Sequence, residues 1–199
     1  KDGQDITVSC IEGEEGRIYD GILSWEDEEL DVRDIKNPQT QVMLILGDPD
    51  QAFSLSFIPN RGVGLMRLEF VINNSVKIHP MALVNFDKLK SEKTRLRIEE
   101  LTHEYENKEE YFIDKLSQGI ATISAAFFPN EVIVRMSDFK TNEYASLIGG
   151  DEFEPGEDNP MLGFRGASRY YNPLYKEGFR LECETIKRVR NDMGFSNVK

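Results

Sequence analysis

GVGLMRLEF, residues 62–70, is a short and mainly apolar run that opens on glycine. Its length and apolar character predict a buried β-strand. Similar runs stand at residues 42–46, which we expect to form a fully buried strand, and at residues 131–137. Helical patterns separate the three runs. Strands that alternate with helices predict an α/β fold built from β/α units around a parallel sheet.

The helical segments are predicted from caps and periodicity. Asp48 followed by Pro49 suits the start of the first helix. Residues 109–127 form a longer amphipathic helix, with apolar side chains at three- and four-residue steps. These apolar positions are Phe112, Ile113, Leu116, Ile120, Ile123 and Phe127. A final helix over residues 176–193 should end at Gly194 and face inward with Phe179, Cys183, Ile186 and Val189.

The remaining segments lie around this core. Residues 5–25 contain two β-branched runs around an acidic, glycine-bearing turn, which predicts a hairpin, and residues 26–40 are polar enough for a linker. Residues 73–107 form a long insertion with its own polar helix. The chain starts at Lys1 without methionine, and we expect it to be an internal piece of a longer protein.

The formal net charge of −12 disfavours nonspecific binding to nucleic acid or to a membrane surface, so a small molecule is the expected partner. No run is as long and apolar as a membrane span, and we expect a soluble, cytoplasmic protein. Cys10 and Cys183 fit no metal or redox spacing, and we expect two plain buried thiols without a disulfide. His79 and His103 lack the neighbours of a catalytic or metal-binding histidine, so structural or solvated roles are expected.

Arginine interrupts two of the predicted strands, at Arg67 and at Arg135. A guanidinium stays charged at neutral pH, so an anion must lie near each of these side chains. A guanidinium presents several N–H donors in one plane. Two such groups at the carboxyl ends of parallel strands suit the binding of a phosphate or a carboxylate. The residue pattern leaves an alternative equally open, in which Arg67 pairs with Glu69 and Arg135 with Asp138 or a neighbouring carboxylate.

Arg165 lies in a loop rich in glycine and proline, where its side chain could reach a bound anion. The alternative is a loop-stabilising contact to Asp158 or Glu157. The same two interpretations apply to Arg169.

Three blocks of the sequence resemble, in the same order, blocks of the phosphoenolpyruvate-utilising enzymes. They are residues 62–70, 132–144 and 159–166, and the resemblance covers essentially the whole chain, including residues 188–194. Threonine usually follows the first arginine in pyruvate phosphate dikinase and in enzyme I of the sugar phosphotransferase system. Here Leu68 follows Arg67, and the amino-acid sequences at residues 138–140 and 164–167 are similar to those of the synthase members.

The resemblance implies a partial (β/α)8 TIM-type barrel, with its first strands only, over residues 37–199. Residues 1–36 would be the terminal hairpin of a swivelling phosphohistidine domain, with a linker. The implied parent enzyme converts ATP, pyruvate and water to AMP, phosphoenolpyruvate and phosphate through a phosphohistidine. Arg67 and Arg135 match the family's substrate-binding arginines, and Arg165 matches a motif near the same site.

Several family features have no counterpart in this chain: the phosphorylated histidine, the ligands of Mg²⁺, the cysteine proton donor and the ATP-binding region. The resemblance therefore implies no catalytic and no metal-binding residue in this segment, and an inactive isolated piece. Expected partners of the parent enzyme are pyruvate, phosphoenolpyruvate and, through another domain, ATP, and we expect a homo-oligomer. The alternatives are a dikinase or enzyme I homologue, and a noncatalytic scaffold fragment.

Overall fold

The computed structural model describes residues 2–11, 15–28, 31, 36 and 38–199. It divides into two compact units, Lys1–Ile35 and Lys36–Lys199. The sequence places a boundary between residues 36 and 37, and the assignment of the first unit to a phosphohistidine domain stays a prediction. No helix within the described residues is long and apolar enough to cross a membrane.

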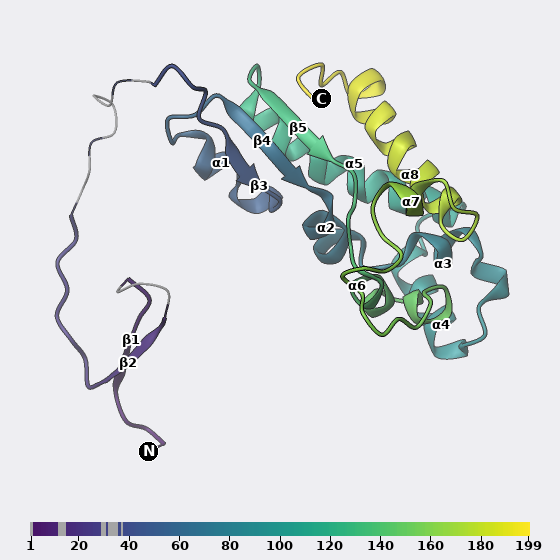
Figure 1. Ribbon diagram of the computed structural model, residues 1–199, viewed down its shortest axis with the longest axis horizontal. Helices are drawn as coiled ribbons and strands as arrows, with labels where there is room; N and C mark the ends of the chain where they lie inside the picture. Colours follow the sequence, from purple (N-terminus) through teal and green to yellow (C-terminus); the bar gives the residue numbers. More distant parts are fainter. Residues whose placement is uncertain (1, 12–14, 29–30, 32–35, 37) are drawn as a thin grey trace. The chain divides into compact units, whose positions relative to one another are not determined.

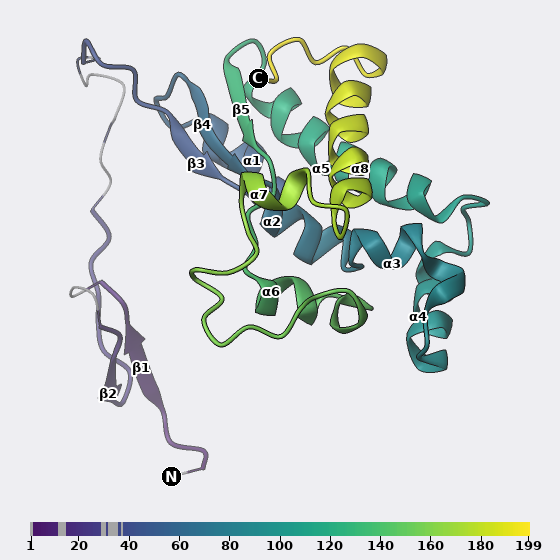
Figure 2. The ribbon, with the colours of Figure 1, turned by 45° about the vertical axis from the view of Figure 1, so that its right-hand side comes forward.

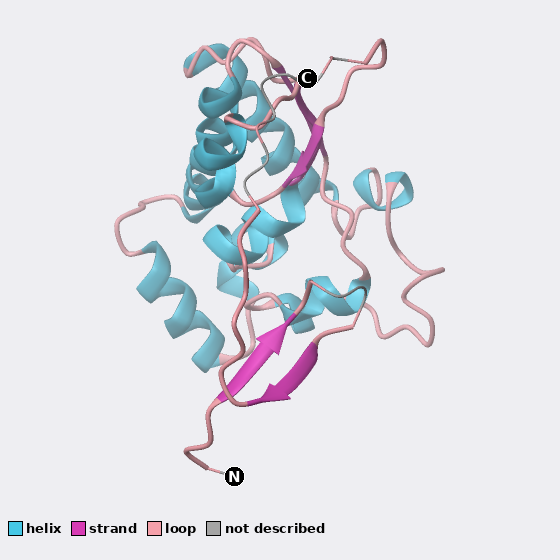
Figure 3. Ribbon diagram, turned by 90° about the vertical axis from the view of Figure 1, so that its left-hand side faces the viewer, coloured by secondary structure: helices cyan, strands magenta, loops and turns pink. Residues whose placement is uncertain are grey.

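The first unit is a β-hairpin (Figure 3). β1 (Ile6–Ser9) pairs with β2 (Arg17–Asp20) in antiparallel register, from Ile6 opposite Asp20 to Ser9 opposite Arg17. The Thr7 hydroxyl donates to the carbonyl of Gly21 at 2.8 Å and accepts from the amide of Leu23 at 2.9 Å. Residues 12–14 of the predicted turn, and residues 29, 30, 32–35 and 37 of the predicted linker, lie outside the described residues.

The second unit is built on a three-stranded parallel sheet in the order β3-β4-β5 (Figure 1). Its strands are β3 (Leu44–Leu46), β4 (Gly62–Arg67) and β5 (Glu131–Arg135). Gly62 has a φ of 113°, and a Cβ there would lie 2.2 Å from the Glu131 carbonyl oxygen, so glycine lets β4 begin against β5. The predicted α/β class with a parallel sheet is confirmed. The described strands form no closed barrel.

The sheet continues beyond β5 through the last residues of the chain. Val198 forms a parallel bridge with Val132. The amide of Val132 donates to the carbonyl of Asn197, and the amide of Val134 donates to that of Lys199, both at 2.9 Å. The Asn197 side chain fixes this segment by donating to the carbonyls of Ser124 and Asn130 at 3.0 Å each. The sequence did not predict this fourth extended segment.

Two helices, α1 (Pro49–Ser56) and α5 (Lys108–Phe127), connect the strands and pack against each other. Asp48 caps α1, because its carboxylate accepts from the amide of Asp50 at 3.1 Å, and Asn107 caps α5 in the same way. All six apolar residues predicted for the inner face of the long helix are buried.

The strand over residues 42–46 is not fully buried. Leu46 is 5% exposed, whereas Ile45 is 71% exposed, and on β5 Val132 is buried while Ile133 is 39% exposed. Successive side chains of a strand point to opposite faces, so one face of this sheet is packed and the other is open within the described residues. The apolar run alone could not reveal that one face has no cover here.

Short helices fill the segment between β4 and α5. They are α2 (Leu68–Val71), the π-helix η1 (Ile72–Val76), α3 (Pro80–Val84), the 3-10 helix η2 (Phe86–Lys88) and α4 (Glu92–Thr102). α4 is the polar helix expected in the insertion. His79 begins α3, where its Nδ1 accepts from the amide of Met81 at 3.2 Å.

The segment after β5 holds α6 (Thr141–Ser146), the 3-10 helix η3 (Gly150–Glu152), α7 (Ala167–Tyr170), α8 (Lys176–Lys187) and the π-helix η4 (Arg188–Asp192). α8 packs against α5 and α3 (Figure 2). Gly194 follows with a φ of 84°, as predicted for a helix end.

The predicted inner face of the last helix is wrong in part. Val189 is buried, Phe179 and Ile186 are half-buried, and Cys183 is exposed. The buried face of α8 instead carries Gly178, Leu181, Glu182 and Thr185. The periodicity was misread because an acid, Glu182, occupies an inner position. Cys10 is also exposed, so neither cysteine is the buried thiol expected, and both are free.

Candidate functional site

The candidate site lies at the carboxyl ends of β4 and β5. Arg67 and Arg135 are the last residues of these strands and are register partners in the parallel sheet. The structure therefore brings together the two arginines that the sequence singled out. The Nε atoms of both arginines are buried and have no hydrogen-bond partner. Two cationic donors with unmet hydrogen-bonding capacity thus occur at one edge of the sheet.

Glu69, in the first turn of α2, contacts Arg135 rather than Arg67. Its Oε1 forms an ion pair with Arg135 Nη2 and also accepts from the backbone amide of Asp138 at 3.2 Å. The pairing of Arg67 with Glu69 is therefore wrong. For Arg135, the partner is a neighbouring carboxylate, which was one of the two options.

Arg67 lies beside a cavity of about 260 Å³. Its guanidinium carbon stands 4.7 Å from the centre of the Phe70 ring. The cavity is lined by Arg67, Glu69, Phe70, Asn73, Asp138, Phe139, Glu143 and Ser146. No ion pair of Arg67 with a carboxylate occurs within the described residues.

Arg165 joins the same region through Asp138. Its Nε and Nη2 donate to the two carboxylate oxygens of Asp138 at 3.2 and 2.9 Å, which is a bidentate contact. This hydrogen bonding raises the pKa of Arg165 above its ordinary value. The alternative predicted for Arg165, a contact to Asp158 or Glu157, is therefore wrong, because its partner is Asp138.

Glu157 holds the same loop by other bonds. It accepts from the Thr141 hydroxyl at 2.5 Å and from the amide of Phe164 at 2.6 Å. These two bonds, that from Thr141 first, lower the pKa of the Glu157 carboxyl, so the ionised form is favoured.

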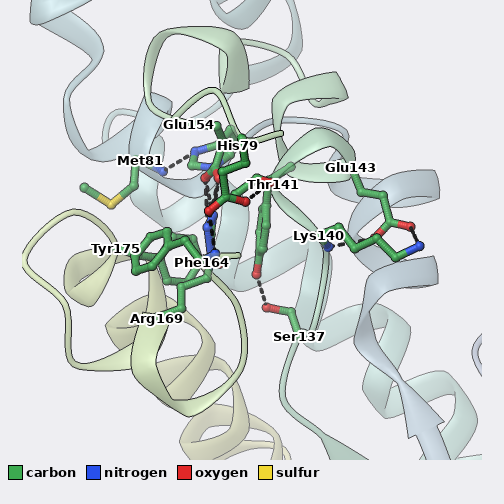
Figure 4. A network of polar contacts seen from close by, with 12 residues as sticks. His79, Met81, Ser137, Lys140, Thr141, Glu143, Glu154, Phe164, Arg169 and Tyr175 are labelled. Carbon is green, nitrogen blue, oxygen red and sulfur yellow. Dashed lines mark hydrogen bonds and ion pairs between the residues drawn. The ribbon is translucent and has the colours of Figure 1, made fainter. Parts of the chain in front are cut away.

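A second cluster consists of the buried side chains of His79, Glu154 and Arg169 (Figure 4). Arg169 Nη1 donates to both Glu154 oxygens at 3.1 and 2.9 Å, and His79 Nε2 contacts Glu154 Oε1 at 3.0 Å. The Arg169 guanidinium also lies 4.0 Å from the centre of the Tyr144 ring and 4.5 Å from that of Phe164. Arg169 therefore stabilises the loop, which was one of its two predicted roles.

His79 has a structural role, as expected, and it is fully buried. Burial lowers its pKa, and the charge of Arg169 acts in the same direction, whereas Glu154 opposes both. Because Glu154 is already paired with Arg169, the neutral imidazole is favoured.

Glu182 is a buried acid that holds the turn after β5. It accepts from the Ser137 amide at 3.0 Å, from the Ser137 hydroxyl at 2.5 Å and from the Tyr175 hydroxyl at 3.0 Å. Burial raises the pKa of its carboxyl. The Tyr170 hydroxyl adds a bond of 2.9 Å to the carbonyl of Ser137. The turn that carries Asp138 is thus fixed from α7 and α8.

Sequence reasoning missed Glu182, because it stands on a helix rich in acids that reads as solvated, and it missed the ion pair between Glu154 and Arg169. In the described part of the chain, no group of three or more His, Cys, Asp or Glu residues could hold a metal ion.

Residues 24–199 match the family model described as PEP-utilising enzyme, PEP-binding domain, where PEP is phosphoenolpyruvate. Curated relatives named phosphoenolpyruvate synthase align with the whole of this chain. The protein from Synechocystis sp. is 51% identical over 199 residues, which is 24% of its own length. Those from Escherichia coli and Aquifex aeolicus are 47% and 46% identical, over 25% and 28% of their lengths. The chain spans about a quarter of the length of these relatives.

Proposed function

The chain belongs to the PEP-utilising enzymes and matches their PEP-binding domain, and from this premise we propose that it is the part of a phosphoenolpyruvate synthase that binds pyruvate and PEP. The parent protein would form PEP from pyruvate, ATP and water by way of a phosphohistidine. The names of the aligned relatives support this assignment. ATP would bind to another part of the parent protein, which we propose to be a cytoplasmic homo-oligomer.

The observation that carries the proposal is the pair of buried, unpartnered Nε donors on Arg67 and Arg135, which are neighbours across the β4-β5 ladder. Such donors need acceptor oxygens, and a carboxylate or a phosphoryl group supplies them in a planar or tripodal array. PEP and the enolate of pyruvate are small anions of this kind.

In the proposed role, the arginines bind and orient the anion and stabilise the negative charge that develops on the enolate oxygen and the transferred phosphoryl group. Fixed cationic donors perform this without reorganising during the reaction. Arg165 would add a third guanidinium near this end of the sheet, with its orientation set by Asp138.

The residues described here do not fit a Mg²⁺ site. Of the three acids that line the cavity, Glu69 and Asp138 are already paired with Arg135 and Arg165, and Glu143 accepts from the amide of Lys140. We propose that the ligands of Mg²⁺ lie in other parts of the parent protein.

We also propose that the second unit is the first part of a (β/α)8 barrel, and that the first unit ends a swivelling phosphohistidine domain. Three observations support the barrel: the strands are parallel and follow their order in sequence, Val198 continues the sheet beside β5, and one face of the sheet exposes Ile45 and Ile133. In a barrel, such a face would line the filled interior.

The test uses the full-length enzyme with Arg67→Ala or Arg135→Ala. We expect each change to reduce PEP formation on the order of 100-fold or more, because a positioned charge is lost from the reacting centre. Leu96→Ala, at a position that is 57% exposed and does not line the cavity, is the control and should leave the rate unchanged. A near-normal rate in either arginine variant would remove the assigned role.

The ion pairs of Arg135 and Arg165 with internal acids favour a second candidate, a noncatalytic scaffold. Calorimetric titration of the full-length protein with oxalate, a planar dianion that stands in for the pyruvate enolate, discriminates between the two. Binding that disappears in Arg67→Ala supports the substrate site, and absence of binding supports the scaffold. An assay of whether water or inorganic phosphate accepts the second phosphoryl group distinguishes a synthase from a dikinase.

A further inference from the structure

We propose that Glu69 is a positioning residue of this site. Its carboxylate fixes the orientation of the Arg135 side chain beside Arg67 and also accepts from the amide of Asp138, the residue that binds the guanidinium of Arg165. The inference rests on the proposed function, because it assigns a partner to the arginines that would bind the substrate anion. Three contacts and one unmet hydrogen bond carry it.

The first contact is the ion pair between Glu69 Oε1 and Arg135 Nη2. The Glu69 side chain is only 9% exposed, whereas the Arg135 side chain is 39% exposed. The acid is therefore the fixed member of the pair, and it restrains the long and partly solvated arginine. Because Glu69 stands two residues after Arg67 on the same chain segment, it joins the end of β4 to the end of β5.

The second and third contacts extend this restraint to Arg165. The same Oε1 accepts from the backbone amide of Asp138, whose carboxylate receives the bidentate fork of Arg165. One buried oxygen thus connects the ends of two strands and, through Asp138, the loop that carries the third arginine.

The unmet hydrogen bond belongs to the other oxygen. Glu69 Oε2 is buried without a partner, and Glu69 lines the cavity next to Arg67. A buried acceptor is expected to find a donor, and a hydroxyl group or a water molecule that accompanies the bound anion would supply it.

A carboxylate beside an anion site works against binding by charge alone, since it cancels part of the positive potential. This conflict makes the proposal testable by the direction of an effect. If Glu69 merely neutralised Arg135, its removal would strengthen the binding of a dianion. If Glu69 positions Arg135, its removal weakens that binding.

The experiment measures oxalate affinity by calorimetry, together with kcat and KM for pyruvate, in the full-length enzyme with Glu69→Gln. We expect oxalate to bind roughly 10- to 100-fold more weakly, and kcat to fall. The reason is that the Arg135 guanidinium, no longer held by Glu69, would lose its proposed bidentate contact with the bound anion. Unchanged or tighter binding of oxalate overturns the proposal.

Glu110→Gln is the matched control. Glu110 forms an ion pair of 2.5 Å with Arg188, on the elements α5 and η4, and touches none of the three arginines of the site. The variant loses the same kind of charge and should keep the wild-type oxalate affinity. A loss equal to that of Glu69→Gln would overturn the proposal.

A double-mutant cycle tests whether Glu69 acts through Arg135. In an Arg135→Ala background, Glu69→Gln should cause no further loss of oxalate affinity, because the side chain to be positioned is gone. Fully additive losses overturn the proposal. If Glu69→Gln does not fold, Glu69→Asp takes its place, since it keeps the charge and withdraws the carboxylate by one methylene. Wild-type affinity in Glu69→Asp would contradict the positioning role.

The same measurements separate this inference from the proposed function. Normal oxalate binding in Glu69→Gln together with weakened but measurable binding in Arg135→Ala defeats the role of Glu69 alone. Normal binding in Arg135→Ala defeats the substrate site, and the role of Glu69 with it.

Discussion

Arg67 shows what a single guanidinium requires at the end of a buried strand. Its charged group lies against the Phe70 ring and the cavity, and its Nε has no acceptor. An arginine cannot discharge by losing a proton, so burying its Nε without an acceptor costs free energy. In the proposed function, the substrate anion would supply that acceptor.

This requirement predicts that lysine cannot replace arginine at this position. Arg67→Lys keeps the charge but removes the Nε donor and the planar fork. We expect kcat/KM for pyruvate in the full-length enzyme to fall roughly 10- to 100-fold, with a smaller effect on folding. Arg61→Lys, at an exposed position just before β4, is the control and should leave the rate unchanged. Equal rates in Arg67→Lys and wild type would contradict the need for a fork.

At this scale, sequence reasoning located the arginines but not their partners. Arg67 and Arg135 stand out because a permanent charge interrupts an apolar run. The alternative pairing of Arg67 with Glu69 requires a strand that continues to residue 69, so that both side chains lie on one face, whereas α2 begins directly after Arg67. The contact of Glu69 with Arg135 depends on the β4-β5 register, which no local pattern contains.

Among the elements, the segment between β5 and α8 depends most on buried polar pairs. Its short helices are joined through Glu154 with Arg169 and through Glu182 with Ser137. Acids and arginines in a loop normally indicate a solvated surface, so sequence periodicity could not reveal these contacts. The six apolar positions of α5, by contrast, follow from sequence, because a long helix with one apolar face has one way to be buried.

His79 at the start of α3 gives this region a pH dependence. Burial lowers its pKa from the ordinary value of 6.5, so between the lowered value and pH 6.5 the unfolded segment binds a proton that the folded segment does not. The stability contributed by neutral His79 is present above about pH 6.5 and is lost as the pH falls below it. We therefore expect local stability to decrease on acidification.

The measurement is hydrogen exchange at the amides of α3 in the full-length protein between pH 7.5 and about 5.5, corrected for intrinsic exchange rates. The free energy of opening should fall toward acid pH in the wild type and should change less in His79→Gln. His103→Gln is the matched control, because this histidine is exposed, and it should keep the wild-type slope. A wild-type slope in His79→Gln would show that another group titrates.

For the whole molecule, the open face of the sheet is the main structural fact. The α/β class and the parallel order of strands could be predicted from alternating runs, but the exposure of Ile45 and Ile133 could not, because a buried strand and a strand awaiting cover have the same composition. In the proposed barrel this face would be covered by side chains from strands in other parts of the parent protein.

This reasoning predicts different outcomes for two exposed apolar residues. Ile45→Glu in the full-length protein should lower soluble yield and thermal stability strongly, because it would bury an unpaired charge inside the barrel. Leu96→Glu, on the insertion helix α4 where Leu96 is 57% exposed, should change stability by less than about 0.5 kcal/mol. Similar melting temperatures for Ile45→Glu and Leu96→Glu would argue against the barrel.

The bridge of Val198 to Val132 has a consequence for how such a protein is made. The segment that extends the sheet beside β5 follows α8 directly in sequence, so during synthesis it would be available soon after α8. The other edge of the sheet, along β3, has no partner among the described residues. In the proposed barrel, β3 would pair with the last barrel strand to be synthesised. The edge of β3 would therefore stay unpaired during most of translation, and a chaperone would protect the nascent chain from aggregation during that period.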